Sequence, residues 1–196
     1  SQGGDLAERV VMIRRQCAMD LGMVIPSIRL RDNIHLKTNE YKVKIRGNEI
    51  AGAEVIPDCL LAMSSNDETH DIKGIKTVEP AFGLSALWIT KSEREKAEMK
   101  GFTIIDPPSV IATHLTEILK KHGHELLDRQ MVQNLIENLR SSQPSLVEEV
   151  FPKLFSAGDL QKILANLLKE SVSIRDMVTI VETMADYAHV TKNCDA

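Results

Sequence analysis

The sequence is poor in aromatic side chains and has no excess of positive charge. Its 196 residues include one Trp, two Tyr and four Phe. The hydrophobic core must therefore be mostly aliphatic, and an aromatic residue that falls in a turn stands out. The formal net charge at pH 7 is −4. This charge argues against a general nucleic-acid binder, which needs clustered Lys and Arg to displace counterions.

Cysteines are few and apolar runs are short. Cys17, Cys59 and Cys194 are odd in number and widely spaced, which fits a reducing compartment better than a disulfide framework. No apolar run approaches the length that spans a membrane, and no signal peptide is visible. We therefore expect a soluble chain without direct membrane contact, preceded by a flexible lead-in at residues 1–4.

Motifs for catalysis or cofactor binding are missing as well. The sequence has no Gly-x-Ser-x-Gly elbow, no catalytic cysteine frame and no glycine-rich phosphate loop. We predict no enzyme, no catalytic residue and no cofactor. His114, His122 and His124 are the candidate metal ligands, but the first two are two helical turns apart, and no Cys or carboxylate stands at ligand spacing. We predict no metal site. A histidine-based metalloprotein is kept as an alternative hypothesis.

The first half of the chain mixes helix and strand signals. Apolar residues recur at helical spacing over 5–21, and Gly22 ends that helix. Gly47-Asn48 is a hairpin signal, and 64–74 is typical of a polar loop. Alternating or short apolar runs predict strands at 27–31, 41–46, 49–55, 60–63, 84–89 and 102–105.

The second half contains helix signals alone. Asp106 caps a helix with Pro107 at its first position, and no strand pattern follows it. The last helix is apolar almost all round, so we expect it to be central. Capping-box spacing predicts helix starts at Ser92 with Glu95, Ser145 with Glu148, and Ser173 with Asp176. Together the two halves predict an α+β fold of separate modules, with the all-helical module beginning near Leu126.

The segment Glu79-Pro80-Ala81-Phe82-Gly83 is the strongest indication of function. It puts an aromatic ring and a carboxylate into a turn, at positions that neither helix nor strand periodicity would bury. Taken alone, an isolated Phe is more often core than surface. Thr113, however, lies on the flank of the helix that Asp106 caps. A shallow cleft with one aromatic anchor and a few polar groups is a sensible protein-docking site.

This turn belongs to a set of short motifs that resembles the cytoplasmic part of the flagellar and type III secretion export-gate family. The set occurs in the family's order over nearly all of the chain, from about Leu6 to the end. Each motif is weak, but the ordered set is specific. Its members are Arg31-Asp32-Asn33, Pro80-Ala81-Phe82-Gly83, Ala112-Thr113-His114-Leu115, Asn166-Leu167-Leu168 and Ile174-Arg175-Asp176-Met177. The motifs at Pro80 and at Ala112 favour the flagellar branch.

The resemblance implies a discontinuous architecture. A first α/β module would comprise 1–57 plus 107–126, a small α/β module would be inserted at 58–106, and a helical module would occupy 127–196. The breaks at Pro57-Asp58 and Asp106-Pro107 are visible in the sequence itself. The family continues into a further module that this sequence lacks. The chain would be the cytoplasmic domain of a bacterial inner-membrane protein.

The resemblance also implies a site and its partners. Glu79, Phe82 and Thr113, with Ile105 nearby, would line a pocket that receives export chaperone–substrate complexes carrying filament-type cargo. Phe82 would be the anchor, Glu79 would accept hydrogen bonds from the partner or steer it, and Thr113 would offer a hydroxyl. The family usually carries Asp where this chain has Glu79. Other export-apparatus proteins would be further partners.

A second hypothesis makes the chain chiefly a self-assembly segment without direct cargo binding. The resemblance implies a nonameric ring in the full-length protein. The free fragment could still be monomeric, because membrane anchoring supplies the local concentration that drives assembly.

Overall fold

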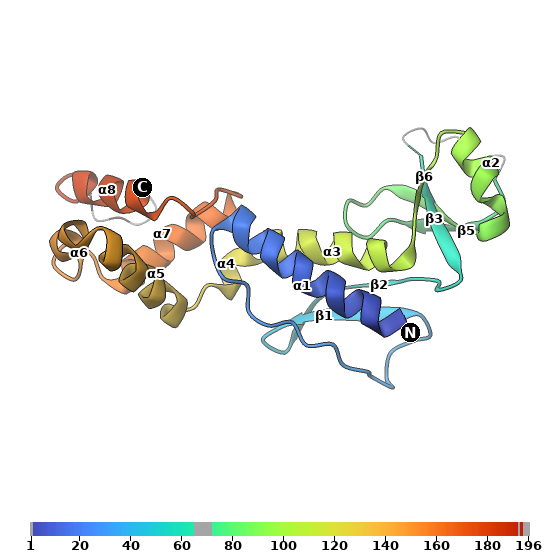
Figure 1. Cartoon of the computed structure of the whole chain (residues 1–196), viewed down its shortest axis with the longest axis horizontal. Helices are drawn as coiled ribbons and strands as arrows, with labels where there is room; N and C mark the ends of the chain where they lie inside the picture. Colours follow the sequence, from blue (N-terminus) through green and yellow to red (C-terminus); the bar gives the residue numbers. More distant parts are fainter. Residues whose placement is uncertain (1, 65–71, 192, 194–196) are drawn as a thin grey trace. The chain divides into compact units, whose positions relative to one another are not determined.

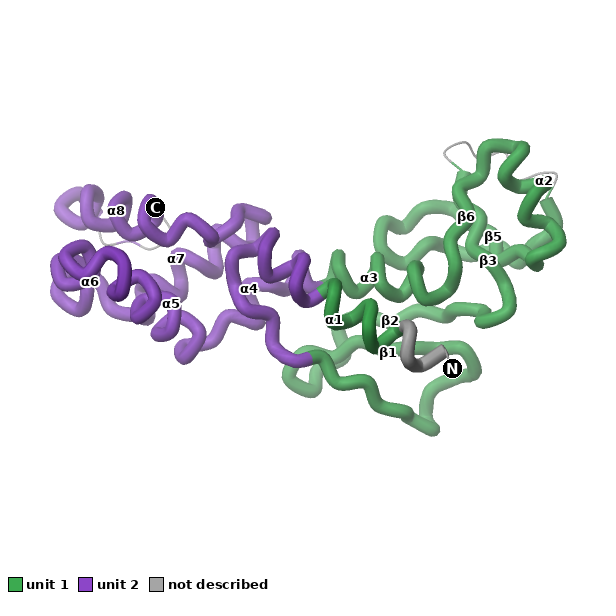
Figure 2. Tube along the Cα trace, viewed as in Figure 1, with its two compact units in different colours: residues 1–13, 28–118 green, residues 14–27, 119–196 purple. Residues whose placement is uncertain are grey.

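The computed structural model describes residues 2–64, 72–191 and 193, and the chain divides into two compact units (Figure 2). Unit 1 comprises residues 1–13 and 28–118, and unit 2 comprises 14–27 and 119–196. Helices α1 (Gln2–Leu21) and α3 (Pro107–Lys121) each contribute residues to both units. The three-module division implied by the family resemblance stays a prediction.

A two-stranded hairpin in unit 1 confirms two of the predicted strands (Figure 1). Strand β1 (Glu40–Ile45) pairs antiparallel with β2 (Asn48–Glu54). Arg46 and Gly47 connect the strands, and both have positive φ, 50° and 87°. This combination is that of a type I′ turn, whose twist matches the twist of the flanking strands.

The second sheet of unit 1 has four antiparallel strands in the order β4-β5-β3-β6. Alternate residues of β5 point to its two faces. Leu87 and Ile89 pack with Ala97 of α2, whereas Trp88 packs with Val110 of α3. The sheet is therefore covered by α2 on one face and by the first turns of α3 on the other. The elements are β3 (Cys59–Met63), β4 (Ile75–Val78), β5 (Ser85–Thr90), the 3₁₀ turn η1 (Lys91–Glu93), α2 (Arg94–Met99) and β6 (Thr103–Ile105).

Two strand assignments differ from the sequence-based expectation. The strand predicted at 27–31 is wrong, because these residues form irregular chain without strand pairing. Pro26 precedes them and has no N–H to donate to a sheet, and Leu30 is exposed. Strand β4 was not predicted, since its four residues are too few for alternation to be recognised. Most of the loop predicted at 64–74 lies outside the described residues.

The regular elements of unit 2 are all helices in its described residues, with no strand among them, which confirms the predicted change of architecture. Helices α5 and α7 bury one apolar stripe each and leave polar side chains outside. No described helix of the chain combines the length and the apolar character needed to cross a membrane. Besides the ends of α1 and α3, the unit contains α4 (Gly123–Leu126), α5 (Arg129–Ser142), α6 (Pro144–Val150), α7 (Ala157–Lys169) and α8 (Met177–Tyr187).

The prediction that the last helix is central is wrong. Helix α8 buries Val181 and Met184, whereas Tyr187 is exposed. The helix packs against α5 and α6 along one stripe, so its remaining apolar side chains are only partly covered. Ile174 is fully buried, but it precedes the helix, whose first turn is capped by the Asp176 side chain.

Gly22 is the point where α1 meets the segment that leads into α8. It ends α1 with a φ of 80°, and a Cβ atom there would stand 2.3 Å from the backbone nitrogen of Arg175. Next to it, Ile174 donates its N–H to the carbonyl of Leu21 at 2.9 Å. The backbones approach so closely that only glycine fits.

We predict that Gly22→Ala lowers the free energy of unfolding by about 3 kcal/mol or more, because positive φ strain and the clash with Arg175 add together. Gly47→Ala is the matched control, since Gly47 also has positive φ but has open space around its Cβ position. The control substitution should lower the free energy of unfolding by only about 1 kcal/mol. Urea unfolding followed by far-UV circular dichroism measures both, and equal losses would show that the close approach is unimportant.

Candidate functional site

The candidate site is centred on the turn between β4 and β5 in unit 1. The backbone N–H of Glu79 donates to the carbonyl of Leu84 at 2.8 Å, and the N–H of Gly83 donates to the carbonyl of Glu79 at 2.9 Å. Gly83 has a φ of 71°, which explains why glycine follows Phe82. The turn predicted from Pro80 and Gly83 therefore forms as the tip of a hairpin.

The Glu79 carboxylate is used inside this turn. It is 2% exposed, and its two oxygens accept the N–H groups of Ala81 at 2.9 Å and Phe82 at 2.8 Å. These bonds compensate the carboxylate for the water that it loses on burial. The conformation thus differs from the expectation that Glu79 faces a partner. Its carboxylate supports the turn from within.

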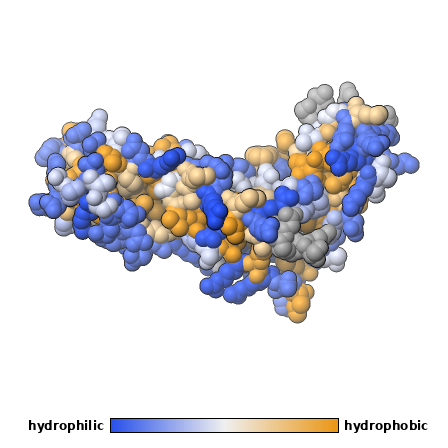
Figure 3. All heavy atoms as spheres, in the orientation of Figure 1, coloured by the Kyte–Doolittle hydropathy of each residue, from blue (hydrophilic) through white to orange (hydrophobic). Residues whose placement is uncertain are grey.

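Phe82 presents an exposed ring at the tip of the hairpin. Its side chain is 61% exposed although its backbone is fixed by Glu79 and by the turn. Leu84, Ile75 and Val78, all on the same hairpin, are also exposed. On the face drawn in Figure 3, apolar residues gather over the four-stranded sheet among hydrophilic neighbours. An aromatic ring held open on a fixed backbone is suited to burial by a partner.

The other two predicted site residues, Thr113 and Ile105, are partly buried in the same unit. Ile105 of β6 packs on the cluster that includes Trp88 and Val110. Thr113 lies on α3 directly before His114, whose pKa is affected by the charge of Glu79.

Sequence reasoning missed Tyr41, which lies on β1 and reaches α3. Its phenolic oxygen is 2.6 Å from Nδ1 of His114, and the two rings meet edge to face, with centroids 5.8 Å apart. The strand pattern at 41–46 carried no sign of a partner 73 residues away. His114 had been considered as a metal ligand and as part of the motif Ala112-Thr113-His114-Leu115.

The surroundings of this pair favour the neutral form of both groups. Burial raises the pKa of the Tyr41 phenol, and the nearby charge of Glu79 raises it further. Burial lowers the pKa of the His114 imidazole, while Glu79 opposes that shift. Both groups are therefore neutral near pH 7, and they share one hydrogen bond, in which either the phenol donates to Nδ1 or an Nδ1–H donates to the phenolic oxygen.

The three histidines that were considered as metal ligands have other neighbours. His114 bonds to Tyr41, and Nδ1 of His122 lies 2.7 Å from Oε1 of Glu125. His124 approaches the same oxygen of Glu125 at 3.8 Å. In the described part of the chain, no group of three or more His, Cys, Asp or Glu side chains is arranged to hold a metal ion.

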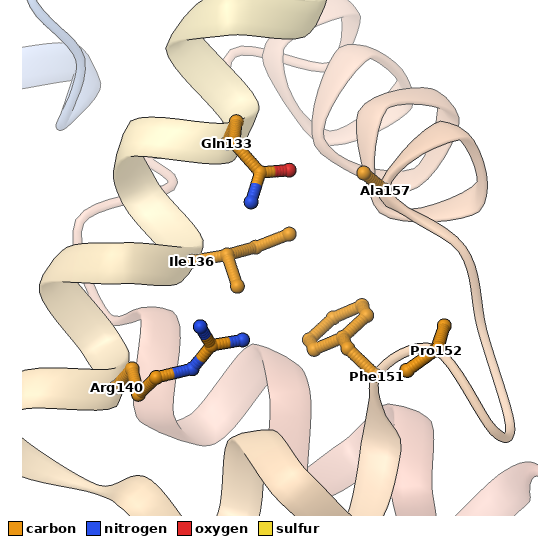
Figure 4. Close-up of a pocket in the computed structure, with 6 residues that line it drawn as sticks. All are labelled: Gln133, Ile136, Arg140, Phe151, Pro152 and Ala157. Atoms are coloured by element: carbon orange, nitrogen blue, oxygen red, sulfur yellow. The ribbon is translucent and has the colours of Figure 1, made fainter.

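A hollow of about 180 Å³ lies in unit 2, between α5 and the start of α7 (Figure 4). Its only charged lining residue is Arg140, which bonds to Glu137 at 3.0 Å. It holds no acid–base pair and no nucleophile, so it offers no catalytic chemistry. Its lining residues are Gln133, Ile136, Arg140, Phe151, Pro152 and Ala157.

Comparison with known sequences gives a family match and close relatives. The FHIPEP family matches residues 1–196. The chain is 55% identical over 195 residues to the flagellar biosynthesis protein FlhA of Bacillus subtilis, covering 100% of this chain and 29% of that protein. Identity to FlhA of Borreliella burgdorferi is 44% over 189 residues, covering 96% and 27%. The chain thus spans less than a third of the length of these relatives.

Solved structures share the fold. The CdsV protein of Chlamydia pneumoniae superposes with a TM-score of 0.82 at 26% identity, covering 97% of this chain and 55% of that one. CdsV in complex with CdsO gives the same TM-score at 25% identity, covering 97% and 59%. The nonameric EscV cytosolic domain, from a type III secretion system, has a TM-score of 0.70 at 19% identity, covering 97% and 56%. This last similarity concerns the fold alone.

We predict that acid destabilises the fold through His114. Because the pKa of its imidazole is lower in the folded chain than the usual 6.5, the unfolded chain binds more protons as the pH falls below that value. The stability is complete above 6.5 and is lost as the pH falls toward the folded-state pKa. The urea midpoint should therefore drop between pH ~7.5 and ~5.5, and it should drop less in His114→Gln. An equal drop in both proteins would contradict this role.

We predict that Glu79→Ala loosens the turn, because the amides of Ala81 and Phe82 lose their acceptors. The unfolding free energy should fall by about 1–3 kcal/mol, and both amides should exchange hydrogen faster. Glu79→Asp keeps a carboxylate that can reach amides two and three residues ahead, so it should preserve most of the protection. Hydrogen exchange followed by NMR compares the variants, and equal exchange in both would rule out the carboxylate as the support of the turn.

Proposed function

Because the chain belongs to the FHIPEP family, on its flagellar branch, we propose that it docks export chaperone–substrate complexes on the surface around Phe82. We define this docking surface as Phe82, Thr113 and Ile105, supported from within by Glu79. The chain would act in the cytoplasmic region of an export gate in the bacterial inner membrane. The single observation that carries the proposal is the exposed Phe82 ring on a fixed turn.

The energetics of the ring favour docking. A Phe side chain gains about 1.5–3 kcal/mol when it is fully removed from water, and more than half of the Phe82 side chain is exposed in the free chain. Its backbone is already held by the Glu79 carboxylate and by the hairpin. Little conformational entropy therefore remains to be lost at the backbone when a partner binds.

The partner would have complementary chemistry. An apolar recess would receive the Phe82 ring, and a polar group at its edge would meet the Thr113 hydroxyl, because an anchor surrounded by a polar rim is typical of protein interfaces. The CdsV–CdsO complex of Chlamydia pneumoniae shows that a structurally similar protein binds another protein. We propose that other export-apparatus proteins likewise contact the whole protein to which this chain belongs.

We also propose that the whole protein associates into a ring, as the nonameric EscV cytosolic domain does. Membrane anchoring would raise the local concentration of the subunits and so favour assembly of weak contacts. Sedimentation of the isolated chain and of the membrane-anchored protein in detergent separates the cases. Assembly of the anchored protein alone supports weak contacts, whereas a monomer under both conditions contradicts the ring.

We predict that Phe82→Ala weakens docking by about 2 kcal/mol or more, which corresponds to a ~30-fold higher Kd, because the anchor of the interface is lost. The probe is a purified flagellar export chaperone bound to its filament-type cargo, both from Bacillus subtilis, titrated by calorimetry. Thermal stability should hardly change, since the ring is exposed in the free chain.

Met99→Ala is the matched control. Met99 is the last residue of α2 and is 81% exposed. Helix α2 packs on the face of the four-stranded sheet that α3 does not cover. The substitution therefore removes an exposed apolar side chain of unit 1 away from the turn, and it should leave Kd unchanged. Equal affinities of Phe82→Ala and the unmodified chain would remove the docking assignment.

A further inference from the structure

Strand β4 lies at the edge of the four-stranded sheet and leads directly into the Phe82 turn. It pairs with β5 on one side, and no strand of the described part of the chain pairs with its other side. Ile75 and Val78 of this strand are each 61% exposed. Large apolar side chains on an open sheet edge are a liability unless a partner covers them. The edge of β4 is therefore a candidate binding surface next to the docking surface.

The register of the sheet shows which backbone groups of β4 are open. The N–H of Glu79 donates to the carbonyl of Leu84, so these two residues form a hydrogen-bonded pair of the hairpin. Bonded and non-bonded pairs alternate along an antiparallel ladder, and Thr77 lies two residues before Glu79 in the same register. Thr77 therefore bonds to β5, whereas Lys76 and Val78 direct their N–H and carbonyl groups to the open side.

The charge along this edge is positive. Lys73 and Lys76 are both exposed. Between Ile72 and Leu84 the only carboxylate is that of Glu79, and it is buried and bonded to the amides of its own turn. An acidic side chain on a strand added beside Lys76 would form a cross-strand ion pair, whereas a like charge there would be unfavourable.

We propose that β4 binds an extended acidic segment of the docked chaperone–cargo complex as an additional antiparallel strand. The inference rests on the proposed docking function, because the segment belongs to the partner that the Phe82 ring anchors. Backbone bonds to Lys76 and Val78 would supply affinity, and a carboxylate opposite Lys76 would select the segment and its register. A second copy of β4 lacks that carboxylate, since none of its four residues is acidic.

The register also predicts the order of side chains in the bound segment. An antiparallel strand meets Val78 first and Ile75 last. Its residues opposite these two side chains would be apolar, because both are exposed, and the residue opposite Lys76 would be Asp or Glu. The simplest such sequence is Val-Thr-Glu-Val. The probe is therefore a fluorescein-labelled synthetic peptide of about ten residues with this sequence at its centre, flanked by Ser and Thr.

Fluorescence anisotropy with the whole chain measures binding of the peptide. Replacing its Glu by Lys should raise Kd about three- to tenfold, and Lys76→Glu should reverse that preference. Lys44→Glu is the matched control, because it changes the net charge equally and Lys44 is exposed on β1, in the other sheet of unit 1. It should leave the preference for Glu intact. Absence of binding, or a preference that Lys76→Glu does not alter, would overturn the inference.

Peptides methylated at one backbone nitrogen test strand addition without altering the protein. In the proposed pairing, the N–H of the Glu opposite Lys76 bonds to β4, whereas the N–H of the Thr opposite Thr77 points away from it. Methylation at Glu should raise Kd about tenfold, and methylation at Thr should hardly change it. Equal effects at the two positions would contradict strand addition.

Hydrogen exchange followed by NMR locates the added strand. In the free chain the amides of Lys76 and Val78 should exchange faster than that of Thr77, which bonds to β5. Saturation with the Val-Thr-Glu-Val peptide should slow exchange at Lys76 and Val78. A bound peptide that leaves both amides unprotected lies elsewhere on the chain, and this result would refute the proposed pairing.

Competition relates the edge of β4 to docking. An excess of the peptide should raise the apparent Kd of the Bacillus subtilis chaperone–cargo complex, and Lys76→Glu should raise Kd about three- to tenfold while Lys44→Glu does not. Failure of the peptide to compete, alongside weaker docking of Phe82→Ala, would overturn the inference and leave the docking function intact. Unchanged docking of Phe82→Ala would instead remove the function on which the inference rests.

Discussion

The surface around Phe82 depends on a carboxylate that is taken out of water. Glu79 bonds to the amides of Ala81 and Phe82, so its charge is compensated by the backbone of its own turn. This arrangement fixes the main chain at the tip of the hairpin and leaves the aromatic ring as the exposed element. A fixed backbone and an exposed apolar ring are combined in this turn because the Glu79 carboxylate is buried and the Phe82 ring is not.

The charge of that carboxylate also acts on a second polar pair in unit 1. Tyr41 and His114 satisfy one another by a single short hydrogen bond, and burial keeps both neutral near pH 7. Val110 and Trp88 pack α3, the helix that carries His114, on the four-stranded sheet. In the proposed docking function, a turn already fixed by the Glu79 carboxylate would need little reorganisation on binding, which favours affinity without a larger contact area.

Much of the fold was predictable, because long amphipathic helices and the hairpin at Gly47 leave local patterns. Capping was harder: α6 begins at Pro144 without the cap expected from Ser145, whereas Ser156 and Asp159 form a capping box that was not predicted. The exposure of Phe82 also followed from its turn. The burial of Glu79 and the hydrogen bond between Tyr41 and His114 did not, since these depend on segments that are distant in sequence and only meet in the folded unit.

Strand β4 lies at the edge of its sheet, with Ile75 and Val78 both exposed on either side of Lys76. Among the described residues, no strand pairs with the edge of β4 that faces away from β5, and a sheet edge of this kind invites pairing with the strand of another molecule. The ammonium group of Lys76 opposes such pairing, because its charge would have to enter a dry interface between sheets. Lys76 therefore opposes aggregation through this edge strand in concentrated solution, although the tip of the same hairpin exposes apolar side chains.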